Sequence, residues 1–203
     1  MYRTLLKIIT CLFFFSFVFA ATSHAVQYEL EMNVNHETFE GALTYSTPLD
    51  NNNFNARFNY IYKEDKYKKG SGELLLSNQV LDDKLTFNLG FNSIYGEIMD
   101  LHKDPKISNV GFVFGLEYTL PDHNLPIPVV LANKASLAPE PICFENTKSH
   151  FQYRANLDFK ILNNAGITMG YRYFRTNFEN GFEKDDYSEQ SVFIGYKLTF
   201  GVK

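Results

Sequence analysis

Few residues in this sequence have the types and the spacing that catalysis requires. Asp122 and His123 are adjacent in the chain, and so are Ser149 and His150. Adjacent residues of an extended strand point to opposite faces, and a serine and a histidine on one face would be two positions apart. We therefore interpret Asp122 and His123 as part of a polar turn, and we predict no catalytic residue in this chain.

The histidines and cysteines do not have the spacing of a metal site. The histidines that follow residue 25 are expected to be solvated or to face an interior; they are His36, His102, His123 and His150. Cys143, in the segment ICFEN, has no second cysteine after residue 25 with which to pair, so we expect no intramolecular disulfide. We interpret it as an inert loop thiol. The sequence predicts no metal, no cofactor and no enzymatic activity.

Charged residues instead recur at alternate positions of extended segments, where they share one face. Positive and negative residues are nearly equal in number on that face. This balance favours an internal network of ion pairs over a selective pore. The residues predicted to form this network are Glu29, Glu31, Arg57, Glu117, Arg154, Asp158, Lys160, Arg172, Glu189 and Lys197.

The elements that position these residues are predicted to be β-strands. Aromatic and aliphatic residues alternate with polar ones from Phe151 to Tyr173, and the turn at residues 163–165 makes this segment a hairpin. The same alternation predicts ten strands and no helix after residue 25. The predicted strands lie near residues 27–35, 39–46, 54–63, 72–80, 85–92, 109–118, 127–137, 151–161, 167–173 and 189–200. The registers of 72–80 and 127–137 are left open, because leucines are consecutive in the first and the second is less regular.

The N-terminal segment has the pattern of a secretory signal peptide. Arg3 and Lys7 precede an apolar run at residues 8–21, and Ser23-His24-Ala25 is the small-x-small pattern of a cleavage site. Cleavage is expected after Ala25, with Ala20 as the alternative. The run is shorter than the ~20 residues of a membrane-spanning helix. We therefore divide the chain into a signal peptide, 1–25, and one domain, 26–203.

Several features indicate that the apolar face of the strands meets lipid. The longer strands reach the ~9–11 residues that cross a bilayer, tyrosines lie near strand ends, and glycines recur on the polar face, as would suit a crowded lumen. With both termini in the periplasm, the outward loops would be residues 35–38, 64–71, 95–107, 138–148 and 179–187. The inward turns would be 47–53, 81–84, 120–126 and 162–165 and are mostly shorter. The sequence thus predicts an all-β fold: a single antiparallel up-and-down transmembrane β-barrel of about ten strands (8 to 12).

Residues 136–200 also resemble a known family. Ser136-Leu137-Ala138-Pro139-Glu140, an alternating strand, an asparagine-rich turn and Gly170-Tyr171-Arg172-Tyr173 occur in an order similar to that of the YfaZ family of predicted outer-membrane proteins. The resemblance implies a signal-bearing outer-membrane barrel whose function is not established.

Barrels that are enzymes provide a contrast. An omptin-type protease would not place Asp122 and His123 in a periplasmic turn, and a lipid A deacylase or phospholipase would need a different spacing of histidine and serine. We expect a structural or surface-interaction protein that acts through its extracellular loops. A narrow porin-like channel is the second hypothesis, and a soluble periplasmic lipocalin-like barrel with an apolar lumen is the third.

The expected partners follow from the expected location in the bacterial outer membrane. They are outer-membrane lipid, lipopolysaccharide and the barrel-assembly machinery, and the protein is expected to be a monomer. The full sequence has a formal net charge of −4, and removal of residues 1–25 takes away Arg3 and Lys7 but no acidic residue. This acidic balance disfavours a nucleic-acid partner.

Overall fold

The computed structural model describes residues 26–50, 52–80, 84–99, 101, 104–121, 127–179 and 186–201. The predicted signal peptide, Asp122, His102 and His123 therefore lie outside the described residues. Within the described part of the chain, no helix has the length and the apolar character needed to cross a membrane.

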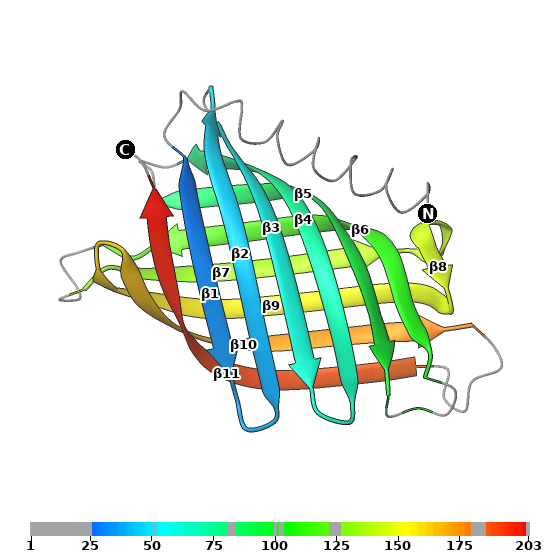
Figure 1. Cartoon of the computed structure of the whole chain (residues 1–203). Coiled ribbons are helices and arrows are strands. Elements are labelled where there is room, and N and C mark those ends of the chain that lie inside the picture. The colour runs from blue at the N-terminus through cyan, green and yellow to red at the C-terminus, as the bar shows by residue number, and fades with distance from the viewer. Residues whose placement is uncertain are drawn as a thin grey trace, which may run out of the picture.

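The described chain forms a closed antiparallel β-barrel (Figure 1). Strands that follow one another pair in sequence, β7 pairs with β9, and β1 pairs with β11 to close the sheet. The barrel strands are β1 (Gln27–Val34), β2 (Thr38–Leu49), β3 (Asn52–Lys63), β4 (Tyr67–Val80), β5 (Leu85–Ile98), β6 (Lys106–Thr119), β7 (Val129–Ala138), β9 (Thr147–Leu162), β10 (Ala165–Phe178) and β11 (Asp186–Gly201). A 3-10 turn, η2 (Glu140–Ile142), leads into the short strand β8 (Cys143–Glu145), which pairs with the start of β6. The predicted single barrel of about ten strands is confirmed.

The two ends of the barrel differ in what they carry. At one end, which we call the terminal end, β1 begins and β11 ends, and Gln27 lies opposite Gly201 (Figure 1). The connections there are residues 50–51, 81–84, 120–128 and 163–164. The other end, which we call the loop end, carries residues 35–37, 64–66, 99–105, 139–146 and 179–185. Three of the five connections at the loop end are long.

The prediction that residues 64–71 form an outward loop is wrong from Tyr67 onward. β4 begins at Tyr67, which pairs with Lys63, so only residues 64–66 form the turn. The charged side chains of this segment are compatible with a strand because they alternate between faces: Lys68 points outward and pairs with Glu97 at 2.9 Å, while Lys69 is buried inside. The predicted difference in loop length between the two ends is correspondingly smaller.

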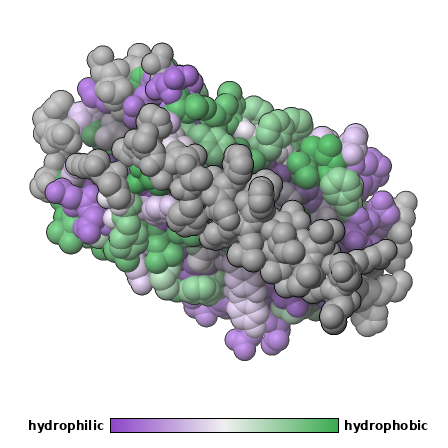
Figure 2. Space-filling model, turned by 45° about the horizontal axis from the view of Figure 1, so that its top comes forward, coloured by the Kyte–Doolittle hydropathy of each residue, from purple (hydrophilic) through white to green (hydrophobic). Residues whose placement is uncertain are grey.

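The apolar face of the strands lies on the outside of the barrel. Phe58 is 63% exposed and Val192 is 70% exposed, and the visible wall of the space-filling view carries large hydrophobic areas (Figure 2). The consecutive leucines of β4 follow the alternation, because Leu74 and Leu76 are exposed on the outside and Leu75 is 8% exposed and faces the lumen. The hypothesis of a soluble barrel with an apolar lumen is therefore wrong, since the apolar and polar faces are the other way round.

Glycines on the inner face permit close contacts. A Cβ at Gly195 would lie 2.2 Å from the carbonyl oxygen of Met32, and one at Gly170 would lie 2.6 Å from the ring of Phe193. Phe193 is an aromatic residue among the polar side chains of the inner face of β11, and it is buried. Gly170 thus provides the space that this ring occupies in the lumen.

Candidate functional site

The middle of the lumen holds a network of buried ion pairs around two carboxylates. Glu31 accepts hydrogen bonds from Arg57 at 2.8 Å and from Arg154. Glu40 accepts from Arg154 and, at 3.1 Å, from Arg172. We call these five residues the central network.

Amide side chains complete the hydrogen bonding of the central network. The Nδ2 of Asn33 donates to Glu31 at 2.6 Å and to Glu40 at 3.0 Å, and Asn59 donates to Glu40 at 2.7 Å. Each carboxylate therefore accepts at least three hydrogen bonds. This satisfaction is necessary, because a buried charge without partners is costly.

The strands bring like charges together on one wall and place their partners on the other. Arg154 of β9 and Arg172 of β10 are directly opposite one another in the register. Like charges in such cross-strand pairs repel each other. Glu40 of β2 forms ion pairs with both guanidinium groups across the lumen. Its attraction to the two arginines offsets the repulsion between them.

Two more cations lie close to this network. Lys134 of β7 pairs with Glu73 of β4 at 2.6 Å, which is a second contact across the lumen. The Nζ of Lys69 donates to the Oε1 of Gln152 at 2.8 Å and lies 3.8 Å from the centre of the Phe174 ring. Lys69 is thus held by an amide and an aromatic face instead of a carboxylate.

The loop end of the lumen is filled by apolar side chains. Tyr67 and Phe174 pack edge to face with their ring centres 5.1 Å apart, and Phe174 is 0% exposed. Next to Phe174 and nearer to the loop end, the Nδ1 of His150 lies 2.8 Å from the Oγ1 of Thr176. The apolar cluster, which we call the cap, consists of Ile61, Tyr67, Ile94, Ile98, Leu101, Ile107, Phe174, Phe178 and Tyr187.

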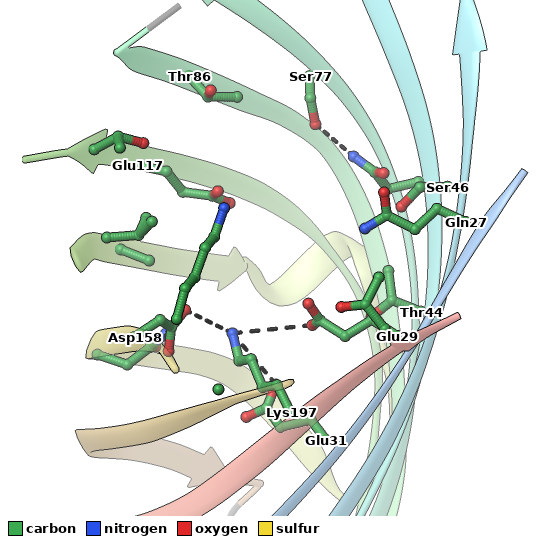
Figure 3. A pocket seen from close by; sticks show the side chains of 18 of the residues that line it. Gln27, Glu29, Glu31, Thr44, Ser46, Ser77, Thr86, Glu117, Asp158 and Lys197 are labelled. Atoms are coloured by element: carbon green, nitrogen blue, oxygen red, sulfur yellow. Dashed lines mark hydrogen bonds and ion pairs between the residues drawn. The ribbon is translucent and has the colours of Figure 1, made fainter. Parts of the chain in front are cut away.

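The terminal end of the lumen contains a polar cavity of about 630 Å³, which we call the vestibule. Lys197 projects into it between Asp158, at 2.7 Å, and Glu29, at 3.9 Å (Figure 3). On another part of the wall, Asn88 donates to Glu117 at 2.9 Å. The lining is rich in hydroxyl and amide groups, so the vestibule can hydrate or bind a small polar solute.

The residues predicted to form one internal network are spread over three levels of the barrel. Glu31, Arg57, Arg154 and Arg172 belong to the central network. Glu29, Glu117, Asp158, Lys160 and Lys197 line the vestibule. Glu189 lies toward the loop end, where it pairs with Lys63 at 2.6 Å.

The predicted set omits several inner residues that the structure brings into contact with it. Lys69 and Glu73 are missing because the start of β4 was interpreted as a loop and the consecutive leucines obscured its register. An alternating series through Lys69, Ser71 and Glu73 was the signal that could have identified them. Glu40 and Lys134 are the other omitted partners.

Of the residues considered for catalysis or metal binding, the structure describes His36, Cys143, Ser149 and His150. Among the described residues, no group of three or more histidine, cysteine or acidic side chains could hold a metal ion. His36 is exposed and pairs with Glu37, whereas His150 is buried in the lumen. The Sγ of Cys143 lies 3.5 Å from the carbonyl oxygen of Ala138 at the loop end. Burial raises the pKa of this thiol to about 11, which disfavours the reactive thiolate at neutral pH.

The comparisons with known proteins match this chain only at the level of solved structures. No family model matches the sequence, and no curated protein does. The chain is similar to Neisserial surface protein A (TM-score 0.39, 11% identity, 88% of this chain and 98% of that chain). It is also similar to the NanC porin (TM-score 0.39, 13% identity, 85% and 98%) and to the beta domain of the Bordetella autotransporter BrkA (TM-score 0.30, 12% identity, 86% and 97%).

Proposed function

We propose that this protein is a bacterial outer-membrane β-barrel with a closed lumen, which has a structural or surface-interaction role through the loops at its loop end. The proposal includes no catalytic activity and no cofactor. Membership of the YfaZ family remains a prediction from the residues that carry the resemblance.

The outer surface supports a position in lipid. A row of large apolar side chains such as Phe58, Leu74 and Val192 would expose an extensive apolar surface to water. In a bilayer the same side chains contact hydrocarbon, and the closed sheet satisfies the backbone hydrogen bonds that lipid cannot. Both termini are proposed to lie on the periplasmic side and the loop end outside the cell.

The closure of the lumen is the observation that carries the proposed role. Residues that line an open aqueous path are accessible to water, but Arg172 is 2% exposed and Phe174, Ile98 and Ile107 are 0% exposed. The central network and the cap therefore interrupt the path between the vestibule and the loop end. What such a barrel can present to its surroundings is its outer wall and its loops.

Conductance in a planar lipid bilayer tests this proposal. The purified barrel is expected to insert without producing stable current steps, while a porin studied under the same conditions does produce them. Insertion is verified by heat-dependent gel mobility of the protein recovered from the same vesicles. Stable steps from the wild-type protein would contradict the closed lumen.

A narrow passage for small solutes is the second candidate, and the vestibule is the feature that favours it. It extends from the terminal end to Glu31 and Arg154, and among the described residues the central network and the cap separate it from the other side. Current that appears only after substitution of cap residues, as in Phe174→Ala, would support a gated passage of this kind.

A further inference from the structure

The outer wall has a groove that follows β4 toward the loop end. It has a volume of about 500 Å³, within the range of ligand sites. Its floor is formed by Gly70 and Gly72, the consecutive outward positions of β4. Phe58 and Tyr60 of β3 flank the floor on one side and Tyr95 of β5 on the other, because they pair with these glycines in the register.

Neither glycine of the floor is required by the fold. A Cβ at Gly72 would meet no atom within 4 Å, and one at Gly70 would meet only a carbonyl oxygen at 3.9 Å. Neither has the positive φ that side chains disfavour. The inner glycines differ, since a Cβ at Gly195 would clash. Glycine within a strand is destabilising, and it often marks a place where another molecule approaches the backbone closely.

The groove ends in a group of charged side chains at the loop end. Lys68, Glu97 and Lys106 lie side by side on β4, β5 and β6, since Lys68 pairs with Glu97 and Glu97 with Lys106 in the register. Lys68 and Glu97 form an ion pair at 2.9 Å. Lys106 is exposed and makes no ion pair with any residue in the described ranges. These three side chains together carry one net positive charge.

We propose that this groove binds one acyl chain of the phosphorylated glycolipid of the outer leaflet, lipopolysaccharide, with a phosphate at Lys68 and Lys106. The chain would lie on the glycine floor between the aromatic side chains. The inference rests on the proposed position in the outer membrane, with the loop end outside the cell.

Charge and geometry together favour a phosphorylated lipid over ordinary hydrocarbon packing. Hydrocarbon alone would not require lysines at the end of the groove, and a free anion would not require an apolar floor. Ammonium groups bind phosphate as point charges and can make charge-assisted hydrogen bonds to its oxygens. Tyr95 is 59% exposed beside the groove, where an aromatic ring with a hydroxyl group suits the boundary between acyl chains and headgroups.

The test measures the lipid that stays bound to the purified barrel in detergent, by native mass spectrometry after titration with lipopolysaccharide. The wild-type protein is expected to retain one molecule. Gly72→Leu places a large side chain in the groove at a position where the added Cβ meets no atom within 4 Å, so the folded barrel is expected to lose about tenfold in retained lipid. Lys106→Gln is expected to lose about three- to tenfold, because it removes a charged donor to phosphate.

Two matched variants control for changes elsewhere on the wall. Ala56→Leu enlarges an outward residue of β3 that does not line the groove, and Lys148→Gln removes an exposed lysine at the loop-end start of β9. Both are expected to retain lipid like the wild type. Phosphatidylglycerol serves as the comparison lipid and is expected to bind at least about tenfold more weakly.

Unchanged retention by Gly72→Leu in a barrel with normal heat-dependent gel mobility would overturn the groove as the site. Equal binding of phosphatidylglycerol would overturn the assignment to the glycolipid. Loss of membrane insertion by the wild-type protein would instead contradict the proposed function, so the two failures are distinguishable.

Discussion

At the scale of single residues, the lumen depends on carboxylates that each serve several cations. Glu40 is 1% exposed and holds both Arg154 and Arg172, which would otherwise face each other as neighbouring positive charges. Removing one member of a buried ion pair costs more folding free energy than the intact pair contributes, because the remaining partner stays charged and desolvated.

Glu40→Gln is expected to lower the free energy of unfolding by about 3–5 kcal/mol, since Arg172 loses its carboxylate partner and Arg154 keeps only Glu31. Urea unfolding in lipid vesicles, followed by far-ultraviolet circular dichroism, measures this loss; the sequence contains no tryptophan to report it by fluorescence. Glu117→Gln is the matched control. Glu117 receives a hydrogen bond from Asn88 at the half-buried wall of the vestibule, and a loss within about 1 kcal/mol is expected. Equal losses for the two variants would contradict the special role of Glu40.

At the scale of elements, β4 illustrates what the sequence could and could not predict. For strands with strict alternation, such as β9 and β10, the sequence predicted both the strand and which residues share each face. Side chains of a strand alternate between faces with a period of two residues. β4 was only partly predicted. Its start is dense in charge, which is typical of loops, and its centre has three consecutive leucines.

The missing information for β4 was its environment on both faces. Lys68 lies on the outside of β4, where it pairs with Glu97 near the loop end. Lys69 lies on the inside, where it donates to Gln152 and contacts the ring of Phe174. The leucine run does not reveal which face is which, because Leu75 lies on the inner face among polar residues while Leu74 and Leu76 lie on the outer face. Contacts with strands distant in sequence decide these cases, and a local pattern does not contain them.

Substitutions in the leucine run test the assignment of faces. Leu74→Arg places a charge against the lipid near the middle of β4 and is expected to cost about 2–4 kcal/mol of folding free energy in vesicles. Leu75→Gln places a polar group in a polar lumen and is expected to cost less than half of that. The same urea titration measures both variants. A larger loss for Leu75→Gln than for Leu74→Arg would show that the register is shifted by one residue.

At the scale of the whole molecule, the lumen is divided along its axis into vestibule, central network and cap. The sequence predicted a packed polar lumen from the balance of charges, but it did not predict this order. The cap residues come from six strands, β3, β4, β5, β6, β10 and β11, and from Leu101 of a connection, and those on strands depart from the polar pattern of the inner face. Their common position depends on the tilt and closure of the barrel.

The proposed orientation can be tested on intact cells with single cysteines in a Cys143→Ala background. Glu64→Cys lies in the exposed turn at the loop end, and Lys84→Cys lies in a turn at the terminal end. A maleimide that does not cross membranes is expected to label the first and not the second. Disrupted cells provide the control, in which both are labelled. The reverse pattern on intact cells would place the termini outside.

The contacts across the lumen also bear on how the barrel is assembled. Arg154 binds Glu40 and Glu31, which precede it by 114 and 123 residues. The carboxylates of β1 and β2 are therefore made long before the guanidinium groups of β9 and β10 with which they pair. An open sheet with these charges and a free edge is poorly suited to hydrocarbon. Transfer into the bilayer and curling of the sheet are thus expected to be a single concerted event, in which the last strands neutralise the first.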